Sequence, residues 1–177
     1  MNKVTQLISN VAAARNEFIK LIKNISESQA GFKPAEGEWS IIDNTEHLFW
    51  AEQGGIYGMW KILYAIRNGT AERSFESAHK DWSIEEIIAK TWKEKEQVPA
   101  VAAPRLGGTL VFWRTSLLSL QQVLEIFGSD LKEEELRLQA HPHPISGAMD
   151  FQQRLEFLRF HIQRHQSQVQ SIINKLI

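Results

Sequence analysis

The sequence contains no cysteine among its 177 residues. Disulfide bonds, thiolate metal ligands and a cysteine nucleophile are therefore excluded. No apolar run approaches the ~20 residues that are needed to span a bilayer. The amphipathic N-terminal segment is interrupted by Asn10, Arg15 and Glu17, which makes it a poor signal peptide. We therefore expect a cytoplasmic protein with no membrane partner.

An excess of charge of one sign is also missing. The chain has 20 lysines and arginines against 21 aspartates and glutamates, and the two signs are interspersed. Proteins that bind nucleic acid usually carry a basic patch, so we expect no nucleic-acid partner. A glycine-rich phosphate loop and a serine nucleophile elbow are absent as well.

The pattern that is present is helical. Apolar residues recur at intervals of three and four through most of the chain, which is the spacing of one buried helix face. Capping boxes predict that helices begin after Ser40, Ser83 and Asp150. We expect Asn68-Gly69 and Gly128 to end two of the helices.

Segments rich in glycine, proline or polar residues separate the helices. We expect residues 31–37, 70–82, 98–108 and 141–147 to be loops or linkers. The sequence therefore predicts an all-α protein, a four-helix bundle that forms a single domain over residues 1–177. Its long helices are expected at residues 4–25, 41–67, 110–127 and 151–176, and a short one at residues 84–91.

The last helix contains two histidines four residues apart, in FLRFHIQRHQSQVQ (157–170). Positions i and i+4 share a helix face and lie about 6 Å apart at the backbone. Relative to Leu158 in the apolar stripe, His165 is rotated by about 20° and His161 by about 60°. Both side chains are therefore expected to face inward, either as hydrogen-bonded core histidines or as ligands of one metal ion.

Two imidazoles are too few for a tight site, so a third ligand is expected on another helix. His47 flanks the apolar stripe of the second helix and is the best candidate. His79 lies in a polar loop and is expected to be solvated, whereas His141 and His143 precede prolines in a turn and favour a structural role. Three neutral imidazoles would leave a fourth position for water or substrate, the pattern of a catalytic metal site.

Small residues continue the face of His47. Two interpretations are open: close packing by a neighbouring helix, or open volume beside a metal site. Glycine inside a helix costs up to about 1 kcal/mol relative to alanine, so a reason for it is expected. The small residues are Ala51, Gly54, Gly55 and Gly58.

Two common metal motifs are missing. Ile162 follows His161 where a metalloprotease of the HExxH type carries glutamate. Asn44 precedes His47 by three residues and Leu158 precedes His161 by three, so there is no Glu-x-x-His pair of the kind that builds a di-iron bundle.

The ordered set of motifs resembles the DinB/YfiT-like superfamily of metal-binding four-helix bundles. The resemblance rests on Trp39-Ser40 followed by His47, on HPISG (143–147), and on a capped helix that contains FHIQRHQSQV (160–169). It implies an up-down-down-up bundle that holds one divalent ion, commonly nickel or zinc, through His47, His161 and His165. It also implies a homodimer.

The resemblance allows three functions. Relatives include transferases that use a small thiol as co-substrate, and others are described as metal-dependent hydrolases. For a transferase, Trp50, Arg105 and Arg154 are candidate substrate-binding residues, with Arg154 holding a carboxylate. For a hydrolase, Asp43 is the nearest general base, although it also fits a capping role. The third alternative is a metal-stabilised binding or stress-response module without catalysis.

Overall fold

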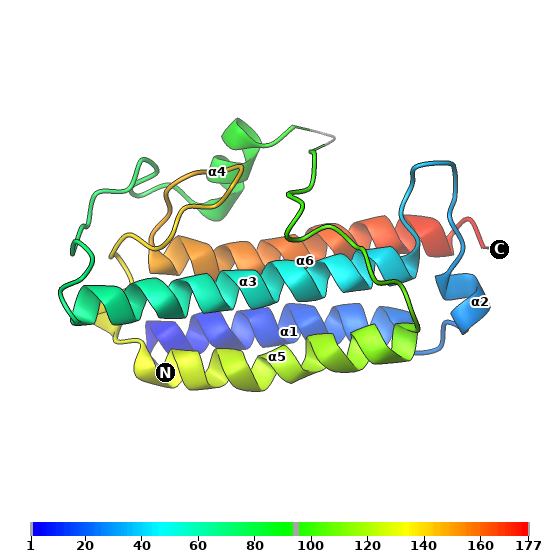
Figure 1. Cartoon of the computed structure of the whole chain (residues 1–177), viewed down its shortest axis with the longest axis horizontal. Helices are drawn as coiled ribbons and strands as arrows, with labels where there is room; N and C mark the ends of the chain where they lie inside the picture. Colours follow the sequence, from blue (N-terminus) through cyan, green and yellow to red (C-terminus); the bar gives the residue numbers. More distant parts are fainter. Residues whose placement is uncertain (1, 94–95, 177) are drawn as a thin grey trace.

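A computed structural model describes residues 2–93 and 96–176, and four long helices dominate it (Figure 1). α1 and α6 run in one direction and α3 and α5 in the other, so the order is up-down-down-up. The prediction of an all-α four-helix bundle is confirmed. The long helices are α1 (Lys3–Ile22), α3 (Ile41–Arg67), α5 (Leu110–Asp130) and α6 (Phe151–Ile173).

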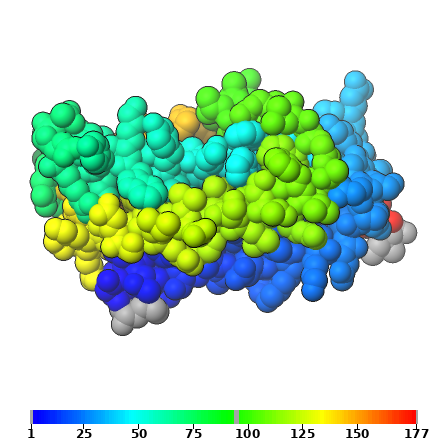
Figure 2. Space-filling view, turned by 60° about the horizontal axis from the view of Figure 1, so that its bottom comes forward, coloured from blue at the N-terminus to red at the C-terminus, as the bar shows by residue number. Residues whose placement is uncertain are grey.

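Each long helix packs against two others. α1 contacts α6 and α5, and α3 contacts α5 and α6. Figure 2 shows α5 between α1 and α3 on one side of the molecule. The apolar stripes of the four helices meet in one core, which includes the fully buried Phe18, Leu48, Leu117 and Leu155. None of the helices in the described residues is both long and apolar enough to cross a membrane.

The connection between α3 and α5 determines where a site can form. The two helices are parallel, so the chain between them must return along the length of the bundle. The described part of this connection, residues 68–93 and 96–109, includes α4 (Ile84–Thr91) (Figure 1). α4 packs on α6. A second, smaller apolar cluster joins them through Ile84, Ile87, Ile88, Met149 and Phe157. The return connection therefore covers part of the bundle.

Helix starts follow the prediction, because capping boxes are present at Ser40, Ser83 and Asp150. The expected end of α5 at Gly128 was wrong, since this helix continues to Asp130. A Cβ atom at Gly128 would lie 2.7 Å from Cγ1 of Ile8. Glycine at this position serves close packing of α1 against α5 and does not end the helix.

Two short elements were not predicted. α2 (Glu27–Ala30) lies between α1 and α3, and a 3₁₀ helix, η1 (Glu133–Glu135), follows α5. Each is about one turn long or less, which is too short to show apolar periodicity. α1 itself ends at Ile22, three residues before the expected Ile25.

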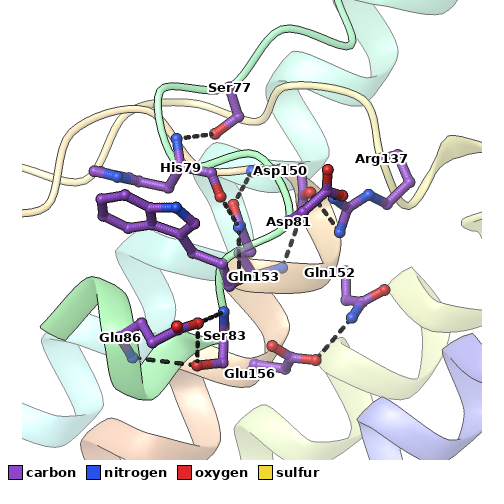
Figure 3. Close-up of polar contacts among 11 residues, drawn as sticks. Ser77, His79, Asp81, Ser83, Glu86, Arg137, Asp150, Gln152, Gln153 and Glu156 are labelled. Carbon is purple, nitrogen blue, oxygen red and sulfur yellow. Dashed lines mark hydrogen bonds and ion pairs between the residues drawn. The ribbon is translucent and has the colours of Figure 1, made fainter.

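The loop before α4 is fastened to the start of α6 (Figure 3). The side-chain amide of Gln153 donates to the carbonyl oxygens of His79, at 2.7 Å, and Trp82, at 3.0 Å. The expectation of a solvated His79 was wrong, because its half-buried ring donates from Nε2 to the Ser146 carbonyl oxygen at 2.6 Å. His79 therefore joins two loops and takes no part in the histidine cluster.

Candidate metal centre

The three predicted histidines lie together between α3 and α6. One ligand atom from each of His47, His161 and His165 lies within 4.8 Å of the others. All three side chains are buried, with exposed fractions of 4%, 4% and 5%. The antiparallel packing of α3 and α6 produces this arrangement, because it sets the first third of α3 against the second half of α6.

Hydrogen bonds fix which ring nitrogen of two histidines faces the cluster. Nδ1 of His47 donates to the carbonyl oxygen of Ala102 at 2.8 Å. Nδ1 of His165 donates to Oδ1 of Asn44 at 2.8 Å, and the Asn44 amide is oriented by its own donation to the Ser40 carbonyl oxygen. Since Nδ1 carries the proton in both neutral rings, each Nε2 keeps a free lone pair.

One pair of nitrogens in the cluster has the spacing of metal ligands. Nε2 of His47 lies 3.1 Å from Nε2 of His161. Two nitrogens bound to one tetrahedral zinc ion at ~2.0–2.1 Å would be about 3.3 Å apart. Nδ1 of His161 is buried and has no hydrogen-bond partner among the described residues. The donor set therefore fits one divalent ion with three imidazole ligands.

The charge state of the rings also suits a metal. Burial lowers the pKa of His47, and the hydrogen bond to Ala102 offsets this only in part. Burial lowers the pKa of His161 and His165 further, well below the ordinary value, and the neighbouring histidines add to the effect. The three rings are therefore neutral near pH 7, and an ion does not have to displace protons from them.

Glu46, the residue before His47, binds the linker that contains Ala102, the hydrogen-bond acceptor of His47. Glu46 is fully buried, and its carboxylate accepts from the backbone N–H groups of Arg105, Leu106 and Gly107 at 2.8–2.9 Å. Burial alone would raise the pKa of Glu46, but these donors lower it below the usual range. Glu46 and His47 thus fasten the linker at both ends of residues 102–107.

A cavity of about 750 Å³ opens in front of the histidines. Trp39 and Trp92 lie beside the cluster, with ring centroids 5.0 Å from His47 and 6.3 Å from His161 respectively. Phe157 stacks on His161 at 5.4 Å. The cavity is large enough for a small molecule and has an apolar wall beside the imidazoles.

Of the two interpretations of the small residues of α3, open volume applies at Gly54 and close packing applies at Gly58. A Cβ atom at Gly54 would meet nothing within 4 Å, so this position leaves open volume in the cavity wall. A Cβ atom at Gly58 would lie 2.5 Å from Cε1 of His141. Gly58 therefore permits close packing, but by a loop side chain and not by a neighbouring helix.

The predicted substrate-binding residues lie in different places. Trp50 and Arg154 line the cavity. Arg105 is exposed and does not line it; its guanidinium lies 4.1 Å from the centre of the Trp50 ring, on the outside. Asp43 does not line the cavity either, since its carboxylate accepts from Ser40 and pairs with Lys33 at 3.1 Å.

Sequence reasoning missed the groups that orient the histidines. In the sequence Asn44 only marks the absence of a Glu-x-x-His pair, yet its amide oxygen fixes His165 across the helix pair. The acceptor for His47 is a backbone carbonyl 55 residues away, at Ala102, which no sequence motif could indicate. The sequence did contain one signal for Asn44: it is a polar residue on the buried face of the helix, about one turn before the candidate ligand His47.

Comparisons with known proteins identify the family of this chain. The sequence model of the DinB superfamily matches residues 10–169. The uncharacterized protein YuaE of Bacillus subtilis strain 168 is 25% identical over 172 residues, which are 92% of this chain and 94% of YuaE.

Two solved structures share the fold. YfiT from Bacillus subtilis, described as a probable metal-dependent hydrolase with an unusual four-helix bundle topology, has a TM-score of 0.58 at 11% identity, covering 99% of this chain and 90% of YfiT. A conserved protein from Enterococcus faecalis has a TM-score of 0.56 at 13% identity, covering 97% and 95% of the two chains. The match over residues 10–169 shows that this chain belongs to the DinB superfamily.

Proposed function

We propose that the protein is a metal-dependent transferase that uses a small thiol as co-substrate. The observation that carries the proposal is the cluster of His47, His161 and His165 at the wall of a 750 Å³ cavity, with no carboxylate among the three. The ion proposed is zinc or nickel, because imidazole ligands suit both.

His47, His161 and His165 would hold the divalent ion, which would lower the pKa of a bound thiol or water molecule. The chain itself contains no cysteine, so a thiol has to come from a second molecule. His47 and His165 contribute by presenting Nε2, because Ala102 and Asn44 hold their Nδ1–H groups. The rings of Trp39 and Phe157 lie against His47 and His161 and give the cluster apolar neighbours.

The distribution of carboxylates favours a thiol over water as the nucleophile. Hydrolysis by a metal-bound water is helped by a general base that accepts its second proton. Glu38 and Glu96 are the carboxylates in the described part of the cavity lining, and both are already engaged, Glu38 with Lys175 and Glu96 with the backbone of Lys93. A thiolate has no second proton to lose, so thiol transfer does not need such a base.

The first test measures metal and thiol binding together. Untagged protein is expected to bind about one equivalent of zinc or nickel per chain, and His47→Ala or His161→Ala is expected to lose most of it. His79→Gln is the matched control, since His79 lies outside the cluster. In cobalt-substituted protein, added thiol should produce a thiolate-to-cobalt absorption band.

Full metal content and unchanged thiol transfer in His47→Ala would contradict the proposal. A metal-binding protein with no thiolate band would also contradict it, and would favour a metal-stabilised binding module without catalysis.

A metal-dependent hydrolase is the second candidate, favoured by the description of YfiT. A panel of esters and amides separates the two functions. Turnover without added thiol, lost in His161→Ala, would assign hydrolysis. Turnover that requires thiol would assign transfer.

We also propose a homodimer. Tyr57 and Tyr64 of α3 are 67% and 71% exposed, and Leu118 and Ile126 of the neighbouring α5 are 40% and 51% exposed. A second copy that covers these side chains would remove apolar surface from water. Sedimentation velocity is expected to give twice the 20.3 kDa chain mass, and the double variant Tyr57→Lys/Tyr64→Lys is expected to sediment as a monomer. A monomeric wild-type protein at micromolar concentration would contradict this.

A further inference from the structure

The wall of the metal cavity contains a buried cation. Arg154 stands on α6, seven residues before His161, and is 4% exposed. Its Nε and Nη1 atoms have no hydrogen-bond partner among the described residues. No described carboxylate forms an ion pair with it, and burial is the whole cause of the change in its pKa, which falls to about 10. The guanidinium is therefore still charged near neutral pH.

The polar contact that Arg154 does make is with a neutral ring. Nη2 donates to Nε2 of His141 at 2.9 Å. An imidazole that accepts from a guanidinium must keep the Nε2 lone pair and so must be uncharged. Burial, followed by the charge of Arg154, lowers the pKa of His141 to about 4. His141 positions the guanidinium but does not neutralise it.

Glycines of α3 make room for this pair. The ring of His141 occupies the place where a side chain at Gly58 would begin. A Cβ atom at Gly55 would lie 3.6 Å from Nη2 of Arg154, and one at Gly54, a turn from Gly58, would meet open space. The helix face opposite Arg154 is therefore open at Gly54, next to the cavity, whereas the His141 ring fills the space at Gly58.

A buried charge without a counter-ion destabilises a folded protein. Arg154 is held in that state, in a cavity with space in front of it and with unpaired N–H donors. Guanidinium groups bind carboxylates by charge-assisted hydrogen bonds. An ordinary structural arginine would have its counter-ion within the fold, as Arg15 has in Glu52.

We propose that Arg154, positioned by His141, forms an anion subsite that binds a carboxylate group of a small molecule in the metal cavity. The inference rests on the proposed function in one respect, namely that the molecule reacts at the histidine cluster. Seven helical residues separate Arg154 from His161, which is about 10 Å along the axis. The carboxylate is therefore remote from the reacting atom and serves to bind and orient the molecule.

The first experiment uses metal-free protein, so that it does not depend on the metal. The ¹H–¹⁵N signal of Arg154 Nε is followed by NMR while sodium acetate is added at constant ionic strength, with acetamide as the uncharged control. We expect a saturable shift with acetate and none with acetamide. Arg154→Gln should remove the signal and the acetate-dependent shifts of neighbouring His141, whereas Arg73→Gln, an exposed loop change of equal charge, should leave them intact.

No saturable response to acetate, or an equal response in Arg154→Gln, would overturn the subsite while leaving the metal proposal standing. A wild-type protein that binds no metal but still responds to acetate would overturn the metal proposal and leave the subsite standing.

The second experiment identifies the molecule that carries the carboxylate. With metal-loaded protein, KM is compared for mercaptocarboxylic acids and the corresponding mercaptoalcohols, and then for electrophiles with and without a carboxylate. We expect at least a tenfold lower KM for the acid in one of the two series, lost in Arg154→Gln and partly kept in Arg154→Lys. An advantage in the first series assigns the carboxylate to the thiol, and one in the second assigns it to the other substrate. No advantage in either series, or one that survives Arg154→Gln, would overturn the proposal.

Discussion

At the scale of single residues, the candidate metal centre depends on hydrogen bonds to the histidine atoms that face away from the cluster. Asn44 and the carbonyl group of Ala102 each take one Nδ1–H, so that Nε2 is the atom left for an ion. The same contacts hold the ring planes in place before an ion arrives. Groups that orient ligands in this way usually contribute about 10–100-fold to metal affinity.

Asn44→Leu is expected to weaken metal binding by about 10–100-fold, because His165 loses the acceptor that fixes its tautomer. Competition with a chromogenic chelator measures the affinity. Asn44→Asp keeps an acceptor and is expected to bind metal at least as well as wild type. Equal affinity in wild type and Asn44→Leu would show that Asn44 does not orient His165.

His141 and His143 should make the metal-free protein sensitive to acid. Burial, then the charge of Arg154, lowers the pKa of His141 to about 4 and that of His143 to about 3. The unfolded chain takes up these protons near pH ~6.5, before the folded protein does, so the free energy of unfolding falls as the pH falls from 6.5 toward 4. Above pH 7 neither state binds the protons, and the effect vanishes.

Urea unfolding at pH 7 and pH 5 measures this dependence. Allowing for the partial exposure of His141, we expect His141→Gln to reduce the loss of stability between the two pH values by about 1 kcal/mol. An identical pH dependence in wild type and His141→Gln would contradict the assignment.

At the scale of elements, α3 has one face that must serve a ligand site, a loop and the core. His47, Gly54 and Gly58 all lie on it, and each has a different neighbour: the histidine cluster, open cavity and the His141 ring. The helix tolerates its glycines because Ser40 and Asp43 cap its start and its apolar stripe is fully buried. Its stability should therefore respond differently at the two glycines.

Gly54→Ala is expected to stabilise the protein by about 0.5–1 kcal/mol, since alanine is the better helix former and its Cβ meets no atom. Gly58→Ala should at least cancel that gain, because the new Cβ displaces the ring of His141 from Arg154. Urea unfolding curves compare the two variants. Equal stabilisation by both would show that the His141 ring moves away at no cost.

At the scale of the whole molecule, a buried ion pair links α1 to α3. Arg15 and Glu52 are 1% and 0% exposed, and Arg15 also donates to Gln121 of α5. Burial raises the pKa of Glu52, and the charge of Arg15 offsets part of that increase. The diagonal helices α1 and α3 are thereby joined through the centre of the bundle.

Arg15→Met is expected to destabilise the protein by about 3–5 kcal/mol, because it leaves the Glu52 carboxylate buried without a partner. The double variant Arg15→Met/Glu52→Leu removes both charges and should recover most of that loss. Thermal and urea unfolding test both variants. A double variant that is less stable than Arg15→Met would contradict this account of the pair.

The sequence by itself determined the four long helices and α4, with most of their starts, since periodicity and capping act within one or two turns. It also identified His161 and His165 as one inward face, because four residues nearly complete a helical turn. For His47 the sequence showed only that it flanks the apolar stripe of another helix; it did not show that the two helices pack together there.

Tertiary structure decided the rest, because the remaining partners are far apart in sequence and meet only when helices pack. Packing of α3 against α6 brought His47 to the pair and gave His165 its Asn44 acceptor. Residues 96–109 of the connection between α3 and α5 supplied Ala102, and the loop after α5 placed His141 on Arg154. Gly128 also shows what the sequence cannot supply. Its local pattern suggests a helix end, but in the bundle it makes room for Ile8 of α1.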